Sequence, residues 1–181
     1  MPTTIYTIGH STHPADEFCR LLQLHGVGRV IDVRRFPGSR RWPHFNREAM
    51  QAWLAAAGID YRHAAHLGGR RRGQSDSPNT FWQNESFRAF ADYMATPEFA
   101  AALQELIGSA EDRPTAIMCS ESLPWRCHRR LIADALVAHG IEVRDIIGTA
   151  ARPYTLNPHA VVRADGRLEY PADVVQRRLL P

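Results

Sequence analysis

The sequence predicts an α/β fold: a mostly parallel sheet of about five strands with helices on both faces and a small C-terminal appendage. Three observations support this class. Short apolar, β-branched runs alternate with amphipathic helical patterns up to residue 147. Glycine, proline and polar residues separate the two kinds of pattern. At 181 residues, the chain can bury the core that such a sheet requires.

The first half of the chain contains three strand patterns and two helical patterns. Residues 4–8 form the first strand pattern, and Pro14 suits the first turn of the helix that follows. Residues 29–33 form the second strand and lead into an arginine-rich loop. Asn46 is a good N-cap for the next helix, which ends before the shorter strand at 59–63. This order is typical of parallel strands joined by helical crossovers.

The second half repeats the alternation. Helical spacing predicts helices at 85–95, 97–107 and 127–139. Short apolar runs predict strands at 115–119 and 141–147. Together these elements define an α/β domain at 1–148.

The last segment of the chain, 149–181, is expected to be a tail packed on the same domain. Asp165 and Gly166 stand between alternating residues, which predicts a β-hairpin there. In the helix predicted at 127–139, Arg130 is expected at the surface, with Asp134 one turn later as its partner.

Composition favours a cytoplasmic protein with an anionic partner. No apolar run reaches the roughly 20 residues that cross a bilayer, so no membrane partner is expected. Three cysteines, an odd number, argue against a disulfide framework. All 22 basic residues are arginine, several of them clustered, and guanidinium groups match phosphate and carboxylate. We therefore expect an anionic small molecule or a nucleic acid as partner, with no prediction of oligomeric state.

Candidate site residues gather where three predicted strands end. Because the carboxyl ends of parallel strands lie at one edge of a sheet, the loops that follow them should meet there. The richest loop runs from Cys119 to Arg129 and contains two thiols, a carboxylate and an imidazole. The candidate catalytic residues are Cys119, Glu121, His10, Cys127, His128 and Asp32. The candidate substrate-binding residues are Ser11, Arg34, Ser39, Arg40, Arg41, Asn46, Arg126 and Arg129.

Several chemistries fit these residues. A carboxylate mechanism would use Glu121 as nucleophile or general base, with Asp32 or His10 as a second acid–base group. A thiol mechanism would use Cys127, because a thiol at a helix N-terminus and near an arginine has a lowered pKa. Tryptophan side chains, Trp82 or Trp125, would stack on a base.

Other chemistries fit less well. A phosphatase cradle needs five residues between Cys and Arg, whereas six separate Cys119 from Arg126. Zinc could be held by Cys119, Cys127 and a histidine (His10, His13 or His128), although the cysteine spacing matches no zinc finger. A redox dithiol lacks the Cys-x-x-Cys spacing. We predict no cofactor and keep zinc as an alternative.

Six short motifs occur in order along the chain and together resemble domain-of-unknown-function family 488. The resemblance extends over about residues 4–148 and implies a compact α/β domain with a shared site, without an established reaction. The motifs are Thr7-Ile-Gly-His-Ser11, Asp32-Val-Arg34 with Pro37-Gly-Ser-Arg40, Phe45-Asn46, His66-Leu-Gly-Gly69, Cys119-Ser-Glu121 and Cys127-His-Arg129.

Our leading hypothesis is an enzyme, a hydrolase or transferase, that acts on a phosphate-bearing substrate resembling a nucleotide or nucleic acid. Its chemistry would lie in the 119–129 loop. One alternative is a non-catalytic module that binds nucleic acid or a metabolite through its arginine-rich loops. Another is a metal- or thiol-dependent redox site.

Overall fold

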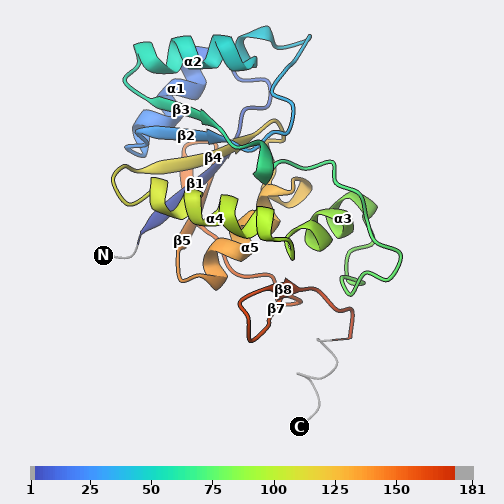
Figure 1. Cartoon of the computed structure of the whole chain (residues 1–181). Helices are drawn as coiled ribbons and strands as arrows, with labels where there is room; N and C mark the ends of the chain where they lie inside the picture. The colour runs from blue at the N-terminus through green and yellow to red at the C-terminus, as the bar shows by residue number, and fades with distance from the viewer. Residues whose placement is uncertain (1–2, 174–181) are drawn as a thin grey trace.

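The computed structural model describes residues 3–173 and contains a six-stranded sheet with helices on both faces (Figure 1). The strand order is β3-β2-β4-β1-β5-β6, parallel throughout except that β6 pairs antiparallel with β5. The predicted α/β class and mostly parallel sheet are confirmed. The strands are β1 (Thr4–Gly9), β2 (Arg29–Asp32), β3 (Asp60–His63), β4 (Thr115–Cys119), β5 (Glu142–Ile147) and β6 (Ala150–Pro153).

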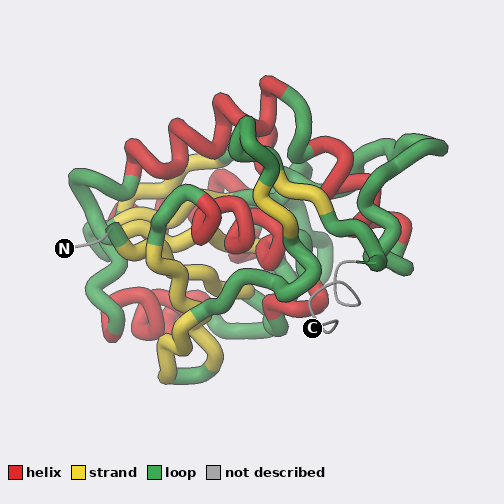
Figure 2. Tube along the Cα trace, turned by 90° about the horizontal axis from the view of Figure 1, so that it is seen from below, coloured by secondary structure: helices red, strands yellow, loops and turns green. Residues whose placement is uncertain are grey.

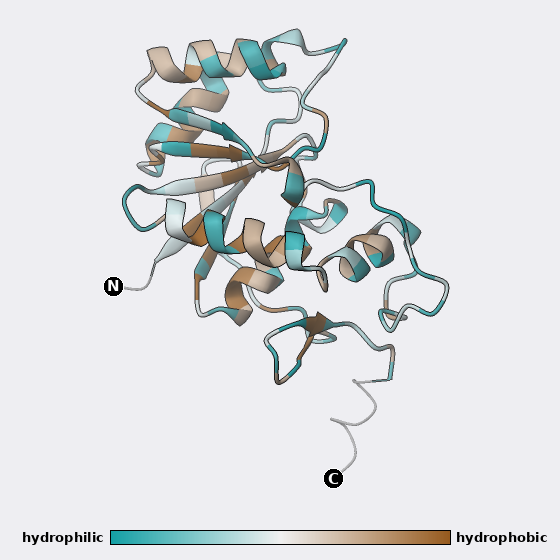
Figure 3. Cartoon of the chain, in the orientation of Figure 1, coloured by the Kyte–Doolittle hydropathy of each residue, from teal (hydrophilic) through white to brown (hydrophobic). Residues whose placement is uncertain are grey.

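Two hydrophobic clusters fill the two faces of the sheet. Side chains alternate along β4, so Ile117 packs on the face covered by α4 and α5, and Met118 packs on the face covered by α1 and α2. The central strands are accordingly apolar (Figure 3). This burial on both faces explains why the strand patterns are continuous apolar runs. The helices are α1 (Ala15–Leu24), α2 (Arg47–Ala56), α3 (Glu85–Tyr93), α4 (Pro97–Ser109) and α5 (Arg129–Ala138).

The starts of α3 and α4 follow local capping chemistry, whereas α1, α2 and α5 have no side-chain cap. The side chain of Asn84 accepts hydrogen bonds from the first turn of α3, and Thr96 accepts one from the N–H of Phe99 in α4. Helix α1 begins one residue after Pro14. Asn46 occupies the N-cap of α2 as predicted, but its side chain accepts a hydrogen bond from the N–H of Ser39 instead of capping the helix. Asn46 therefore fixes the loop after β2.

The tail adds both an edge strand and a hairpin. Strand β6 follows β5 immediately, so the sheet continues into the segment predicted as the tail and gains its sixth strand. The predicted hairpin is confirmed, with β7 (Val161–Val162) antiparallel to β8 (Leu168–Glu169) and Gly166 at φ +83° in its turn. Loops form much of the surface on this side, as the view from below shows (Figure 2). Residues 174–181 of the predicted tail lie outside the described residues.

Packing of the tail overturns one expectation for α5. Asp134 is fully buried and accepts hydrogen bonds from Tyr154, Tyr170 and the backbone N–H of Asn157. Its predicted pairing with Arg130 is wrong, because the tail covers the outer face of the helix and supplies other donors. The fully buried Tyr170 belongs to the core on that face.

Arg130 instead donates to the carbonyl of Trp125 and lies over the ring of Trp82. Trp82 is itself core, at 5% exposure, and so unavailable to stack on a base as the sequence suggested. Within residues 3–173, the helices are too short or too polar to cross a membrane.

Candidate functional site

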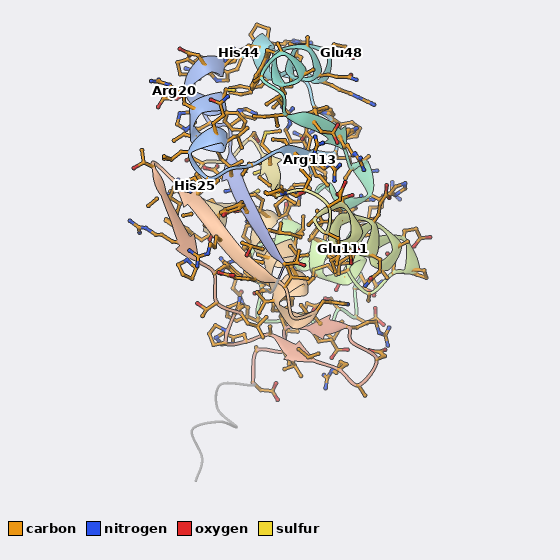
Figure 4. All side chains as sticks on the ribbon, turned by 90° about the vertical axis from the view of Figure 1, so that its left-hand side faces the viewer. Arg20, His25, His44, Glu48, Glu111 and Arg113 are labelled. Atoms are coloured by element: carbon orange, nitrogen blue, oxygen red, sulfur yellow. The ribbon has the colours of Figure 1, made fainter. Side chains whose placement is uncertain are left out.

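A pocket of about 680 Å³ opens at the carboxyl-terminal edge of the sheet, where the loops after β1, β2 and β4 meet. The strands run toward this edge, at the right in Figure 1. Figure 4 views the opposite side, and its labelled residues, such as His25 and Arg113, do not line the pocket. The pocket is lined by His10, Ser11, Thr12, Arg34, Arg35, Phe36, Gly38, Ser39, Trp42, Gly69, Arg70, Ser86, Phe87, Cys119, Ser120, Glu121, Ser122, Arg126, Cys127 and His128.

The loop after β4 crosses closely over the end of β1. The N–H of His10 donates to the carbonyl of Cys119 at 2.8 Å, and the N–H of Ser11 donates to that of Ser120 at 3.0 Å. A Cβ added at Gly9 would lie 1.8 Å from the carbonyl oxygen of Glu121. Glycine is therefore required at the end of β1, because any side chain would push the 119–126 loop away from the sheet.

Two thiols form the floor of the pocket, and a buried guanidinium lies behind them. The Sγ atoms of Cys119 and Cys127 are 2.7 Å apart. Arg129, only 1% exposed, donates from Nη1 to Cys119 Sγ at 2.7 Å and to the carbonyl oxygen of Glu121 at 2.7 Å. Its Nη2 lies 3.4 Å from the carbonyl oxygen of Ser122. The guanidinium thus connects the β4 loop to the start of α5.

This arrangement separates the pKa values of the two thiols. Burial favours the neutral form of Cys119, but the hydrogen bond from Cys127 and the charge of Arg129 outweigh it and lower its pKa to about 7. The hydrogen bond to Cys119 and burial raise the pKa of Cys127 well above its ordinary value. The lowered pKa expected for Cys127 is therefore wrong, because Cys127 lies before the first turn of α5 and is the donor of the pair. Cys119 is therefore the thiolate near neutral pH, and Cys127 is the thiol that donates to it.

His128 borders the thiol pair as a neutral imidazole. Its Nε2 lies 3.0 Å from the carbonyl oxygen of Val33 and 3.1 Å from that of Leu67, which assigns the ring proton to Nε2. The lone pair on Nδ1 then faces Cys127 Sγ at 3.6 Å. Burial is the main cause that lowers the pKa of His128 to about 4. Gly69 packs beside this ring, and a Cβ added there would make an ordinary van der Waals contact with it at 3.4 Å.

A second buried arginine stands beside the first site, at the end of β2. Arg34 donates from Nε and Nη2 to the two carboxylate oxygens of Asp32, at 2.9 and 2.7 Å. Tyr61 also donates to Asp32, at 2.6 Å, and Arg34 donates to the carbonyl of Phe45 at 2.7 Å. Because its oxygens are engaged by these donors, Asp32 positions Arg34 rather than facing the pocket.

His10 completes this second site. Its Nδ1 lies 2.9 Å from the carbonyl oxygen of Ser11, so Nδ1 carries the proton and Nε2 accepts from Arg34 Nη1 at 3.3 Å. The ring stacks on Phe45 with centroids 4.1 Å apart. Burial, aided by the charge of Arg34, lowers the pKa of His10 to about 4. His10 is accordingly a neutral wall of the pocket.

The pocket mouth is positively charged and carries an exposed aromatic ring. Arg35, Arg70 and Arg126 line it and are exposed, and Glu121 is the one acidic residue in the lining. Phe36 is 64% exposed, with the guanidinium carbons of Arg35 and Arg70 at 5.4 and 6.0 Å from its ring centroid. Such a mouth suits a ligand with an anionic group and a flat ring.

The structure brings most of the predicted residues together. Arg129 is buried behind the thiols rather than lining the pocket, and Asp32 and Asn46 lie in the supporting layer. Arg40 and Arg41 are exposed outside the lining. The other candidates line the pocket: Cys119, Glu121, His10, Cys127, His128, Ser11, Arg34, Ser39 and Arg126.

Sequence reasoning missed Arg35, Phe36 and Arg70 as pocket residues. The clustering of arginines in both loops was a usable signal for the two basic residues. The sequence gives no comparable signal for Phe36, because the path of the loop decides whether this apolar side chain is exposed in the pocket.

No group of three or more His, Cys, Asp or Glu within residues 3–173 stands in an arrangement that could hold a metal ion. Of the three histidines considered as third zinc donor, His128 directs Nε2 at two carbonyls and has only Nδ1 near Cys127. Zinc stays a hypothesis that elemental analysis of protein purified without chelator can test.

Comparison with known families agrees with the motif resemblance. The model of the family described as "Domain of unknown function DUF488" matches residues 14–136, which covers the ends of β2 and β4 and the whole thiol site. Neither a curated protein nor a solved structure matches the chain.

Proposed function

The chain belongs to the DUF488 family, and from its pocket we propose that it is an enzyme that uses the Cys119 thiolate to attack a phosphate-bearing, nucleotide-like substrate. One observation carries this proposal: Cys119 Sγ lies in the floor of a positively charged pocket, 2.7 Å from a buried guanidinium. A thiolate stabilised near neutral pH is the nucleophilic form of cysteine.

The substrate's phosphate would bind at the mouth of the pocket. Arg35, Arg70 and Arg126 supply charged donors, and the serine hydroxyls of the lining add neutral ones. The ring of Phe36 would stack on a base, the role that the sequence suggested for tryptophan. This arrangement would direct the rest of the substrate toward Cys119.

In the first step the thiolate sulfur forms a bond to an electrophilic carbon or phosphorus of the substrate. The bond from that atom to its leaving group breaks, and the leaving group departs with the electron pair. In the second step water or an acceptor hydroxyl attacks the adduct and releases the thiolate. Glu121, half-buried in the lining, would take the proton of the attacking group as general base. The reaction is thus a hydrolysis or a group transfer.

Turnover of a nucleotide and nucleoside panel by purified protein tests this function, with intact-mass detection of an adduct on Cys119. Cys119→Ser should lower turnover by more than about 10⁴-fold. Cys19→Ser, in the third thiol outside the pocket, should leave turnover unchanged. Full activity of Cys119→Ser together with loss of activity in Glu121→Gln would overturn the thiolate mechanism in favour of a carboxylate one.

A second candidate is a non-catalytic module that binds nucleic acid, favoured by the exposed Phe36 between two arginines. It predicts salt-sensitive binding of single strands without product, because phosphate contacts release counterions. Phe36→Ala would weaken that binding without changing its salt dependence, whereas Arg70→Ala would reduce the salt dependence.

The thiols also bear on location. A reducing compartment such as the cytoplasm would keep Cys119 and Cys127 reduced, and we propose this location for the protein.

A further inference from the structure

We propose that Cys119 and Cys127 form a redox couple, a dithiol that reduces a hydroperoxide and closes to an intramolecular disulfide. The inference shares the Cys119 thiolate with the proposed function but requires none of its substrate. It rests first on the geometry of the pair at the floor of the pocket.

The two sulfur atoms are already close enough for bond formation. They lie 2.7 Å apart and both line the same pocket, with Cys119 at the end of β4 and Cys127 just before α5. A disulfide bond of about 2.05 Å requires them to approach by less than ~1 Å. Both residues are buried, at 2% and 6% exposure. Their proximity is therefore set by the fold and not by mobile loops at the surface.

The burial of Cys119 also selects the oxidant. A thiolate that is 2% exposed at the floor of a pocket is accessible to a small molecule, whereas attack on a protein disulfide needs space around the sulfur. A small hydroperoxide meets this requirement. The Nη1 of Arg129, 2.7 Å from Cys119 Sγ, lies behind the sulfur and leaves its pocket side open to the hydroperoxide.

The chemistry balances in two steps. The thiolate of Cys119 attacks the distal oxygen of the hydroperoxide. The O–O bond breaks, and the alkoxide or hydroxide leaves with the electron pair and takes a proton from the solvent to form alcohol or water. Cys119 is now a sulfenic acid. Cys127 sulfur then attacks Cys119 sulfur, the S–O bond breaks, and the departing hydroxide takes the Cys127 proton to form water. The peroxide gains two electrons and the dithiol loses two.

His128 is placed to assist the second step. Its unprotonated Nδ1 lies 3.6 Å from Cys127 Sγ, while Nε2 is held by the carbonyls of Val33 and Leu67. Once Cys119 is no longer a thiolate, this lone pair can accept a hydrogen bond from the Cys127 thiol and so orient it for attack. Cys127 is therefore the resolving thiol and Cys119 the peroxidatic one.

Arg129 makes this disulfide easy to reduce. No Asp or Glu among residues 3–173 forms an ion pair with Arg129, whose Nε is also buried without a hydrogen-bond partner. The thiolate is thus the anion nearest to its charge, and oxidation removes it. A couple whose reduced form is stabilised in this way is a comparatively strong oxidant. Closure would block Cys119 as a nucleophile until a dithiol reductant restores it.

Titration of the reduced full-length protein with hydrogen peroxide, without any nucleotide, tests the inference. We expect one equivalent of peroxide to remove Cys119 and Cys127 together from alkylation, and peptide mapping to identify a Cys119–Cys127 disulfide that dithiothreitol reverses. Cys127→Ser should instead accumulate sulfenic and then sulfinic acid on Cys119. Cys19→Ser should behave as wild type. Circular dichroism of each variant verifies folding, and the wild-type peptide map alone is decisive if Cys127→Ser does not fold.

Oxidation of Cys119 to sulfinic acid in the wild type while Cys127 remains alkylatable would overturn the redox couple. So would a disulfide that involves Cys19 or a second chain. Rapid alkylation of Cys119 and turnover of a nucleotide without the disulfide would remove this inference and leave the proposed function intact. A Cys119–Cys127 disulfide, with neither turnover of a nucleotide nor an adduct on Cys119, would remove the proposed function and leave this inference intact.

Discussion

Two neighbouring strands, β2 and β4, end in sites that contain the same three kinds of group but differ in the anion. Each has a buried arginine, an anionic partner and a neutral histidine. At β2 these are Asp32, Arg34 and His10, and at β4 they are Cys119, Arg129 and His128. Both arginines are almost fully buried, so each charge needs compensation.

The difference lies in the anion. A carboxylate supplies its charge whether or not anything else happens, and two oxygens receive two donors from Arg34. A thiol supplies charge only when it ionises, and here the hydrogen bond from Cys127 and the charge of the buried Arg129 favour ionisation of Cys119 near neutral pH. At β2 the buried arginine is paired with a carboxylate, whereas at β4 its nearest anion exists only when a thiol ionises. Replacing each partner in turn should expose that difference.

The largest effect is expected on stability, at β2. Asp32→Asn leaves Arg34 buried and unpaired, which should lower the free energy of unfolding by about 3–5 kcal/mol. The loss should be similar from pH 6 to pH 9. Cys119→Ala should cost less at pH 6, and its cost should grow as the pH rises toward 9. The folded pKa of Cys119, about 7, lies below the ordinary 9.0, so its stabilisation is complete above 9 and lost as the pH falls through 7.

Urea denaturation of both variants at several pH values measures these losses. Parallel pH profiles for Asp32→Asn and Cys119→Ala would contradict the distinction between a permanent and a conditional anion.

The second prediction concerns reactivity. Arg129→Met removes the charge while keeping much of the buried volume, so the pKa of Cys119 should rise above its present value of about 7. The rate of alkylation of Cys119 at pH 7 should fall by on the order of tenfold to a hundredfold, because the thiolate fraction falls. Iodoacetamide labelling followed by peptide mapping gives the rate at each thiol. Arg130→Met, which does not touch the thiol pair, is the matched control and should leave the rate unchanged.

The sequence predicted the location of both sites because their convergence follows from topology. Parallel strands bring the loops after residues 9, 32 and 119 to one edge whatever the side chains do. It did not predict which arginines are buried. Arg129 was assigned to the substrate, although a usable signal existed: two arginines in the first turn of a helix oppose its dipole unless an anion lies nearby.

The misplacement of Asp134 has a different cause. Helical periodicity marks the outer face of α5 as polar, and it cannot reveal that the tail covers that face with Tyr154 and Tyr170. The short Sγ–Sγ distance was equally hidden, because eight positions separate Cys119 from Cys127 and the intervening 3₁₀ turn decides whether they meet.

The third prediction displaces the loop after β4. Gly9→Ala places a methyl group 1.8 Å from the carbonyl oxygen of Glu121, the same oxygen that accepts from Arg129. The displaced loop should separate Cys119 from Arg129, slow alkylation several-fold and cost about 1–3 kcal/mol of stability. Gly38→Ala is the control, since its added Cβ meets nothing within 4 Å. Thermal melting and the labelling rate are the measurements, and wild-type values for Gly9→Ala would show that the loop does not depend on this close approach.

The smallest expected effect is a difference close to zero between the pKa values of His10 and His128. Burial is the main cause that lowers the pKa of both His10 and His128 to about 4, and each ring donates to backbone carbonyls. Both should remain neutral as the pH falls from 6.5, while the unfolded chain binds protons. The free energy of unfolding should therefore fall between pH 6.5 and 4. NMR titration of the imidazole resonances should give two midpoints near pH 4. A His128 midpoint near pH 6.5, with that of His10 still near 4, would mean that the imidazole beside the thiolate is free to ionise and the one beside the carboxylate is not. The two sites would then share a buried arginine but not a neutral histidine.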